Sequence, residues 1–325
     1  MQKRNLFVWQ RSTVFLVAAV ASSLILAPIW LLNPRLEQAI FQRPSRQMQQ
    51  KNAQFASDKA PIVLEERGLS KALALLQQEA KAELLNFPLP TQFQGKTLKA
   101  VKLSGKEKVI ALTFDDGPTP PYTQQILEIL KKNNIKATFF LIGLNVKLYP
   151  QLAQKVVAEG HVIANHTWSH SYRHFSPEGA AREIEDTAAL IYKTTGVKTS
   201  IFRPPGGFLH NGVADYAQKK KYFIALWSTD SNDWQPSSPQ TLVKNVLRYA
   251  KPGGMALMHD GGGPRSHTVQ ALPKIIAQLK RQGYKFVTVP ELLQMGDSQL
   301  KAQSAAKLNP KREDRLPKNQ IKSST

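Results

Sequence analysis

The stretch Val109–Pro118, VIALTFDDGP, decides the fold of this chain. Its first six residues carry no charge and are mostly apolar, which is typical of a strand buried on both faces of a parallel sheet. Asp115 and Asp116 follow at once, so we expect this pair at the carboxyl end of the strand. In α/β sheets and barrels, chemistry usually sits at that end. A plain turn is the alternative interpretation, because Asp, Gly and Pro are turn formers.

A second strand-like run, HVIAN at 161–165, leads directly into HTWSH at 166–170. This motif places His166 and His170 four residues apart. One carboxylate and two imidazoles make the three-ligand set of an open catalytic zinc site, and the second carboxylate of the Asp pair remains free to act as a base. Each motif alone has a structural explanation. Because the Asp pair and the histidine motif each follow a predicted strand, the two motifs together predict a metal site.

Three further motifs follow short apolar runs: RPPGG at 203–207, DSNDW at 230–234 and LMHD at 257–260. In order with TFDDGP and HTWSH, they resemble the five motifs of the polysaccharide deacetylases, carbohydrate esterase family four, also called the NodB-homology domain. The resemblance covers roughly residues 107–293. It implies a metal-dependent hydrolase that removes N-acetyl groups from a glycan.

The resemblance also assigns roles to the motif residues. Asp115 would be the general base, and His259 the general acid that protonates the departing amine. Asp116, His166 and His170 would hold the metal. The ligand set suits Zn²⁺, and Co²⁺ or Ni²⁺ could take its place.

Other motif residues would support these groups. Arg203 would pair with Asp115 and keep its pKa low, and Asp230 would pair with His259 and raise its pKa. A backbone N–H in the Pro205–Gly207 loop, which includes Gly206, would stabilise the oxyanion. Trp234 and Leu257 would wall the pocket for the acetyl methyl group. Asp233 is interpreted as a residue that caps its own loop.

Between the motifs, apolar residues recur at helical spacing, and strand-like runs separate these segments. The predicted helices cover Thr123–Asn133, Pro150–Glu159, Pro177–Thr195, Pro239–Tyr249 and Thr268–Gln282. Alternating β and α elements predict a parallel α/β architecture. The family resemblance sharpens this to a distorted (β/α) barrel of about seven strands, preceded by a transmembrane helix and a stem.

The predicted domains are a cytoplasmic tip and membrane anchor at 1–34, a stem at 35–106, the catalytic domain at 107–295, and a basic disordered tail at 296–325. Basic residues precede the apolar stretch 14–32, which is about long enough to span a bilayer and would leave the remainder exported. A cleavable signal peptide is the alternative, and it would make the protein secreted. Within the stem, the apolar spacing predicts a helix over Ser70–Leu85.

The formal net charge is +21, from 44 Lys and Arg against 23 Asp and Glu. Such a surface attracts polyanions, but the chain has no nucleic-acid-binding motif and is expected outside the cytoplasm. Anionic lipids or acidic envelope polymers are therefore the expected counterparts, unless the charge only solubilises the stem and tail. The absence of cysteine excludes thiol nucleophiles and thiolate metal ligands.

The sequence thus predicts an enzyme that deacetylates GlcNAc units of a cell-envelope glycan, with peptidoglycan as the first choice. Chitooligosaccharide or exopolysaccharide deacetylation and O-acetyl removal from xylan are the other substrate hypotheses. A non-catalytic wall-binding protein is the hypothesis from another class. It is disfavoured because Asp115, the predicted ligands and His259 are all present.

Overall fold

The computed structural model of this chain describes residues 69–70, 87–105 and 107–308. Contacts divide the chain into a unit at 1–71 and a unit at 72–325, and the following concerns the second unit. The predicted anchor, nearly all of the predicted stem helix and the end of the tail lie outside the described residues. Among the residues that the structure describes, no helix has both the length and the apolar character to cross a membrane.

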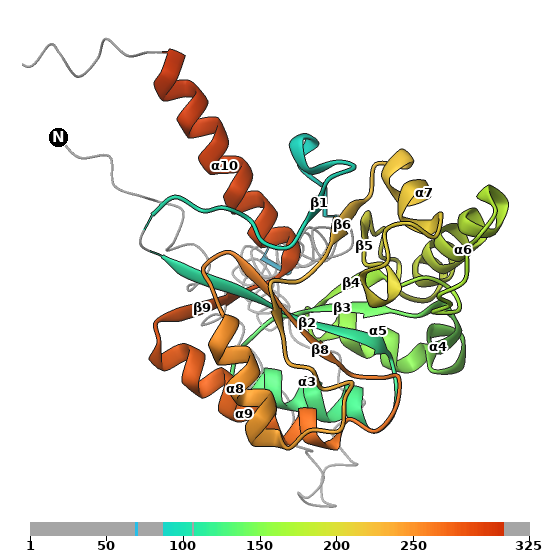
Figure 1. Ribbon diagram of the computed structural model, residues 1–325, viewed down its shortest axis with the longest axis horizontal. Coiled ribbons are helices and arrows are strands. Elements are labelled where there is room, and N and C mark those ends of the chain that lie inside the picture. The colour runs from blue at the N-terminus through green and yellow to red at the C-terminus, as the bar shows by residue number, and fades with distance from the viewer. Residues whose placement is uncertain (1–68, 71–86, 106, 309–325) are drawn as a thin grey trace, which may run out of the picture. The chain divides into compact units, whose positions relative to one another are not determined.

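The centre of the domain is a parallel sheet of nine strands (Figure 1). They are β1 (Thr97–Leu98), β2 (Lys108–Gly117), β3 (Thr138–Leu141), β4 (Val162–Asn165), β5 (Ile201–Phe202), β6 (Phe223–Ala225), β7 (Thr229–Asp230), β8 (Gly254–His259) and β9 (Tyr284–Val287). The order is β1-β6-β5-β4-β3-β2-β8-β7, and β9 pairs with the first half of β2. Within the described chain β1 and β7, the strands at the two ends of this path, do not pair with each other, so the sheet is a curled half-barrel and not a closed one. The sheet has two strands more than the predicted seven, because very short strands such as β1 and β7, with two residues each, also pair in it.

Helices cover this sheet. They are α3 (Tyr122–Lys132), α4 (Gly143–Leu148), α5 (Pro150–Ala158), α6 (Pro177–Thr195), α7 (Val213–Lys219), α8 (Pro239–Tyr249), α9 (Ser266–Arg281) and α10 (Val289–Leu308), with 3₁₀ turns η2 (Thr91–Phe93) and η3 (Pro205–Gly207). All five helices predicted between the motifs are present. Two begin at a serine cap followed by proline: the Ser176 and Ser238 hydroxyls accept hydrogen bonds from backbone N–H groups three residues later.

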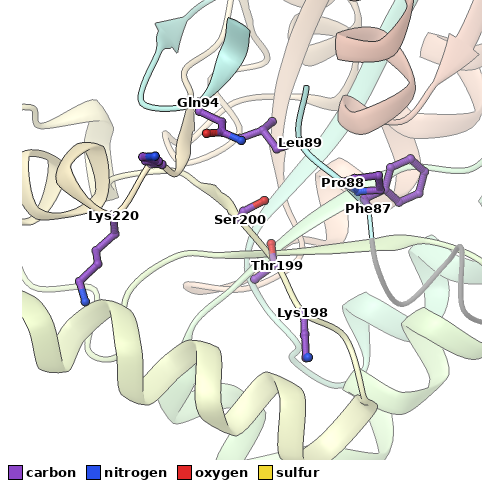
Figure 2. Close-up of a pocket in the computed structure, with 9 residues that line it drawn as sticks. Phe87, Pro88, Leu89, Gln94, Lys198, Thr199, Ser200 and Lys220 are labelled. Carbon is purple, nitrogen blue, oxygen red and sulfur yellow. The ribbon is translucent and has the colours of Figure 1, made fainter. Parts of the chain in front are cut away.

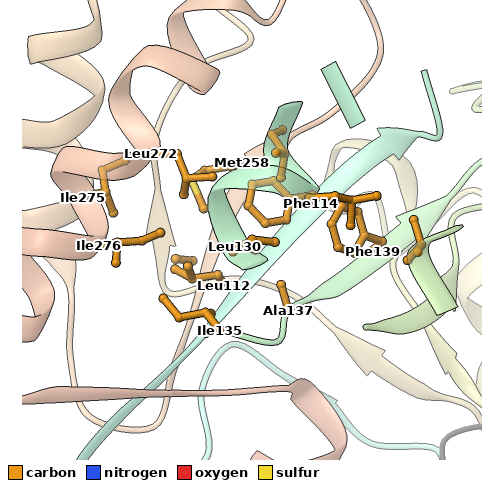
Figure 3. Close-up of a cluster of buried hydrophobic side chains, with 14 of the residues drawn as sticks. Leu112, Phe114, Leu130, Ile135, Ala137, Phe139, Met258, Leu272, Ile275 and Ile276 are labelled. Atoms are coloured by element: carbon orange, nitrogen blue, oxygen red, sulfur yellow. The ribbon is translucent and has the colours of Figure 1, made fainter. Parts of the chain in front are cut away.

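Strand β2 is buried on both faces, which explains its nearly continuous apolar sequence. On one face Leu112 and Phe114 join a large cluster with side chains such as Leu130 of α3 and Ile276 of α9 (Figure 3). On the other face, the alternating residues of β2 pack in a second cluster with the start of α10. The strand that carries the Asp pair is therefore held rigidly from both sides.

The residues on either side of the predicted catalytic domain, 107–295, pack against it. Residues 87–105 join the domain, because β1 pairs with β6 and the Val101 N–H donates to the Gly253 carbonyl at 2.8 Å. Residues 296–308, predicted to be disordered, continue α10. This helix packs on the same early segment: Gly296 lies against Val101 and Phe93, and Gln92 Nε2 donates to Asp297 Oδ1 at 2.7 Å.

Candidate active site

Asp115 and Asp116 lie at the carboxyl end of β2, as predicted, and both are buried. Successive side chains of a regular strand point to opposite faces. Here the pairing of β2 with β3 shifts register between Asp115 and Gly117, and Asp116 has φ +71°. This bulge re-aims one side chain, so two consecutive carboxylates can serve one site. A left-handed backbone at a non-glycine residue is strained, and such strain concentrates at functional sites.

Asp116, His166 and His170 come together as the sequence predicts. His166 Nε2 lies 3.3 Å and His170 Nε2 lies 3.1 Å from Asp116 Oδ1, and the three potential ligand atoms all lie within 4.8 Å of one another. Asp116 Oδ1 is buried and accepts no hydrogen bond from the residues that the structure describes. Burial raises the pKa of Asp116, but its two histidine neighbours outweigh that effect and hold it well below its usual range. An ionised, unsatisfied oxygen facing two imidazoles fits a divalent cation.

Neighbouring groups orient these ligands. His166 Nδ1 lies 2.7 Å from the Arg203 carbonyl, which can only accept, so Nδ1 donates and Nε2 keeps its lone pair for a metal. The loop between the two histidines is held by the buried Glu183 of α6. Its carboxylate accepts from the backbone N–H groups of Trp168 and Ser169, each at 2.9 Å.

Arg203 pairs with Asp115, as the sequence predicts. Its Nη1 lies 2.7 Å from Asp115 Oδ1, and the same nitrogen donates to Thr113 Oγ1 at 2.9 Å. The guanidinium is fully buried, and its Nε donates to the Ala225 carbonyl at 2.8 Å. Burial lowers the pKa of Arg203, and the charge of Asp115 opposes that shift. The pair therefore fixes one oxygen of Asp115 and leaves Oδ2 on the side of His166, 3.6 Å from its Nε2.

The predicted pairing of Asp230 with His259 is wrong, and Asp233 takes that place. His259 Nδ1 donates to Asp233 Oδ1 at 2.6 Å, and the His259 backbone N–H donates to Asp233 Oδ2 at 2.8 Å. Asp230 turns into its own loop instead, where it accepts from Trp227 Nε1 at 3.1 Å and from the Asn232 N–H at 2.7 Å. The left-handed backbone of Asn232, with φ +57°, makes this turn and directs Asp233 toward β8.

The ion pair between His259 and Asp233 shifts the pKa values of both residues. Burial lowers the pKa of His259, but the hydrogen bond to Asp233 and the charges of Asp233, Asp115 and Asp116 outweigh it and raise the pKa to about 9. Burial raises the pKa of Asp233, yet the bonds from His259 and Thr268 hold it below its ordinary value. His259 is therefore protonated at neutral pH and can give a proton to a leaving group.

The sequence and fold of this chain are similar to those of known proteins. Residues 102–224 match the family model described as polysaccharide deacetylase. A peptidoglycan-N-acetylglucosamine deacetylase of Bacillus cereus is 44% identical over 195 residues, which cover 59% of this chain and 91% of that protein. The chain belongs to the polysaccharide deacetylase family. Members of this family use a divalent metal ion.

Two other relatives support the assignment. Peptidoglycan-N-acetylmuramic acid deacetylase PdaC of Bacillus subtilis is 35% identical, over 71% of this chain and 47% of that protein. A solved peptidoglycan N-acetylglucosamine deacetylase in complex with a benzamide ligand superposes with a TM-score of 0.59 at 36% identity, covering 62% of this chain and 94% of the other.

The residues predicted to contact substrate differ in exposure. Leu257 of β8 and Pro205 of η3 are buried. Gly206 is exposed and has φ +58°. Trp234 is 56% exposed, which excludes the interpretation that it is a core residue of this deacetylase. All four lie in segments at or just beyond carboxyl ends of strands.

The loop after His259 contains two buried polar residues to which the sequence analysis assigned no role, Asp260 and Arg265. Arg265 is buried and donates to the carbonyl groups of Gly261 at 2.6 Å and Asp233 at 2.8 Å, so it ties this loop to the one that carries the partner of His259. Asp260 is fully buried and accepts from Thr123 Oγ1 at 2.6 Å, and burial raises its pKa to about 7. The sequence analysis also assigned no role to Glu183 of α6. Its sequence does carry a signal, because a charged residue at an apolar position of an amphipathic helix is expected to be buried and to bond with a neighbouring loop.

A hollow of about 610 Å³ lies away from these motifs (Figure 2). Its lining includes Thr199 and Ser200, which precede β5, and Lys221, which precedes β6. It is therefore at the amino-terminal ends of these strands, whereas the catalytic motifs follow the carboxyl ends. No residue of the predicted catalytic or metal set lines it.

Proposed function

We propose that this deacetylase hydrolyses the N-acetyl group of GlcNAc units in a cell-envelope glycan, with peptidoglycan as its substrate, and releases acetate. The convergence of the Asp116–His166–His170 cluster with two buried ion pairs, Asp115–Arg203 and His259–Asp233, carries the proposal. The similar proteins from Bacillus cereus and Bacillus subtilis are named as peptidoglycan deacetylases, which supports peptidoglycan as the substrate.

Asp116, His166 and His170 would hold the metal, and Zn²⁺ fits their oxygen and nitrogen donors, with Co²⁺ or Ni²⁺ as substitutes. When bound, the ion lowers the pKa of the attacking water and polarises the acetyl carbonyl. These residues would supply three protein ligands, the number typical of catalytic zinc sites.

Asp115 is the general base that takes a proton from the attacking water. Its Oδ1 is engaged by Arg203 at 2.7 Å, so Oδ2, on the side of the ligand histidines, is the oxygen that can accept this proton. The buried guanidinium holds the carboxylate in a fixed orientation through this charge-assisted hydrogen bond. Thr113 shares the same guanidinium nitrogen and completes its bonding.

His259 is the general acid. An amide anion is a very poor leaving group, so the amine must receive a proton as the C–N bond breaks. Asp233 keeps His259 charged and aims it through Nδ1, which leaves Nε2 to face the substrate. Asp230 has only an indirect influence, through its charge and its place in the same loop.

The oxyanion is stabilised by the backbone N–H of Gly206. Pro204 and Pro205 have no N–H, and the Gly207 N–H is already bonded to the Pro204 carbonyl at 2.9 Å. Gly206 is therefore the residue of this loop whose amide can serve the developing negative charge. Leu257 and Trp234 wall the pocket for the acetyl methyl group, with Leu257 as the buried side and Trp234 as the exposed one.

Peptidoglycan lies outside the cytoplasmic membrane, so this reaction takes place on that side. The apolar stretch 14–32, preceded by basic residues, anchors the enzyme there, or is removed as a signal peptide. The excess of 44 basic over 23 acidic residues favours contact with anionic envelope polymers or lipids and not with nucleic acid.

Acetate release from a panel of glycans tests the proposal. Zinc-loaded enzyme is incubated with peptidoglycan, chitopentaose and acetylated xylan, and Asp115→Asn is the matched control. We expect release from peptidoglycan that the substitution abolishes. Faster release from xylan would overturn the substrate, and no release from any of them would leave a glycan-binding protein that has lost catalysis.

A further inference from the structure

Two large aromatic side chains next to the metal cluster remain exposed. Tyr172 is 54% and Phe208 is 52% exposed, and the mechanism above uses neither. Single exposed aromatics are common, but rings that gather beside a catalytic centre usually mark a binding surface. The function of the deacetylase supplies an obvious ligand, because its substrate extends beyond the sugar that reacts.

The two rings continue a row of aromatic contacts from the metal ligands. The centroid of the Tyr172 ring lies 5.3 Å from that of His170, and the Phe208 centroid lies 5.5 Å from that of Tyr172. Both contacts are edge-to-face, the arrangement that aromatic quadrupoles favour. The pair is therefore an ordered extension of the site and not two independent surface residues.

The backbone beneath the rings is shaped to fit them. Gly206 has φ +58°, and a Cβ there would come within 2.8 Å of Tyr172 Cε1 and 3.1 Å of Phe208 Cδ2. The absence of a side chain lets both rings pack down on this loop. The surface they form is thus already in place before a ligand arrives, which lowers the entropy that binding must lose.

The strand order places the pair on one side of the reaction centre. Along the sheet, β5 leads to Phe208, β4 to Tyr172 and β2 to the Asp pair, while β8 and β7 lead to His259 and Trp234 on the other side. The Tyr172 ring centroid lies 5.3 Å from that of the metal-cluster residue His170, and the Phe208 centroid lies a further 5.5 Å from that of Tyr172, so the pair extends outward from the cluster. The acetamido group is held at the cluster itself, so the next sugar of the glycan chain is the part of the substrate that would reach the two rings.

We propose that Tyr172 and Phe208 form a stacking platform for a sugar unit that flanks the GlcNAc being deacetylated, so that the enzyme selects glycan chains over single sugars. This rests on the proposed function. A pyranose ring has a face of C–H groups that can pack on an aromatic ring while its hydroxyl groups stay in water. The platform lies on the β4–β5 side, and Trp234 belongs to the other side.

Phe208 is the residue to change, because Tyr172 touches a metal ligand and its loss could disturb the metal. Tyr192 on the outer face of α6 is the matched control: it is 51% exposed, and its contact with Lys198 is remote from the motifs. Binding is measured by calorimetry in the full chain with zinc and with Asp115→Asn to silence hydrolysis. The ligands are chitopentaose and the monosaccharide GlcNAc.

We expect Phe208→Ala to weaken chitopentaose binding by about tenfold, because the sugar loses its apolar contact with one aromatic ring. The affinity for GlcNAc should stay unchanged, and Tyr192→Ala should leave both affinities unchanged. In the active enzyme, Phe208→Ala should raise KM for chitopentaose with little change in kcat. Equal affinities of Phe208→Ala and its parent would overturn the platform, as would an equal loss for both ligands. Failure of the proposed function would appear separately, as absence of acetate release by the parent enzyme.

Discussion

Replacing Asp233 with Asn should lower the pH at which the enzyme loses activity in alkaline solution. Asp233 accepts the Nδ1–H of His259 at 2.6 Å, and its charge helps to raise the pKa of His259 to about 9 against the opposing effect of burial. A general acid acts only while it is protonated. We therefore expect kcat/KM of the parent to persist to high pH and to fall as the pH rises through about 9.

The size of the effect follows from the two protonation states. A shift from 6.5 to about 9 corresponds to roughly 3 kcal/mol in favour of the charged imidazole. The two largest effects that raise the pKa are the hydrogen bond and the charge of Asp233, ahead of the charges of Asp115 and Asp116. Asn keeps the shape but not the charge, and burial remains, so the pKa should return to its ordinary range or below. At pH 8 the protonated fraction, and with it kcat/KM, should then fall about 30-fold.

The assay is acetate release over a pH series, with Asp230→Asn as the matched control. Asp230 lies in the same loop but bonds to Trp227 and Asn232, so its substitution should move the alkaline limb only slightly. At pH 6 both variants should retain most of the parent activity. An alkaline limb that stays near 9 in Asp233→Asn, or that moves further in Asp230→Asn, would refute the assignment of Asp233.

Three further predictions concern the groups behind the site. Glu183→Gln should weaken zinc binding by about tenfold, because it loosens the loop between the two ligand histidines; competition with a chelator measures this, and unchanged affinity would contradict it. Arg203→Met should destabilise the metal-free protein by about 3–5 kcal/mol in urea unfolding, because it leaves Asp115 buried without its partner. The double variant Arg203→Met with Asp115→Leu should recover part of this stability. No recovery would argue against the loss of the ion pair as the cause. Phe114→Ala, in the centre of the core, should cost about 3–5 kcal/mol through the cavity it creates; a loss below about 1 kcal/mol would mean that the core closes around the gap.

The sequence predicts the parts of the site that lie at strand ends. An apolar run followed by Asp115 and Asp116 predicts a buried strand with the pair at its carboxyl end, and the structure confirms the strand and the position of the pair. The histidine motif follows a neighbouring parallel strand, so the metal cluster is a consequence of strand order. The pairing of Arg203 with Asp115 was likewise predicted through the family resemblance and is present.

The sequence does not determine whether Asp230 or Asp233 pairs with His259. Both belong to one short motif, and the backbone turn at Asn232 decides which carboxylate faces His259. Composition also misled at both ends of the domain. Residues 87–105 and 296–308 carry no clear strand or helix periodicity, and their order comes from non-local contacts such as that of Gln92 with Asp297.

A zinc titration of the metal-free enzyme, with acetate release from peptidoglycan as the readout, tests the central claim most directly. We predict that release rises with added zinc and reaches its maximum at one equivalent per chain, as expected for a single three-ligand site. Asp115→Asn should bind the same equivalent and release no acetate. Full activity without metal, or activity that survives in Asp115→Asn, would contradict a metal-dependent deacetylase that uses Asp115 as its base.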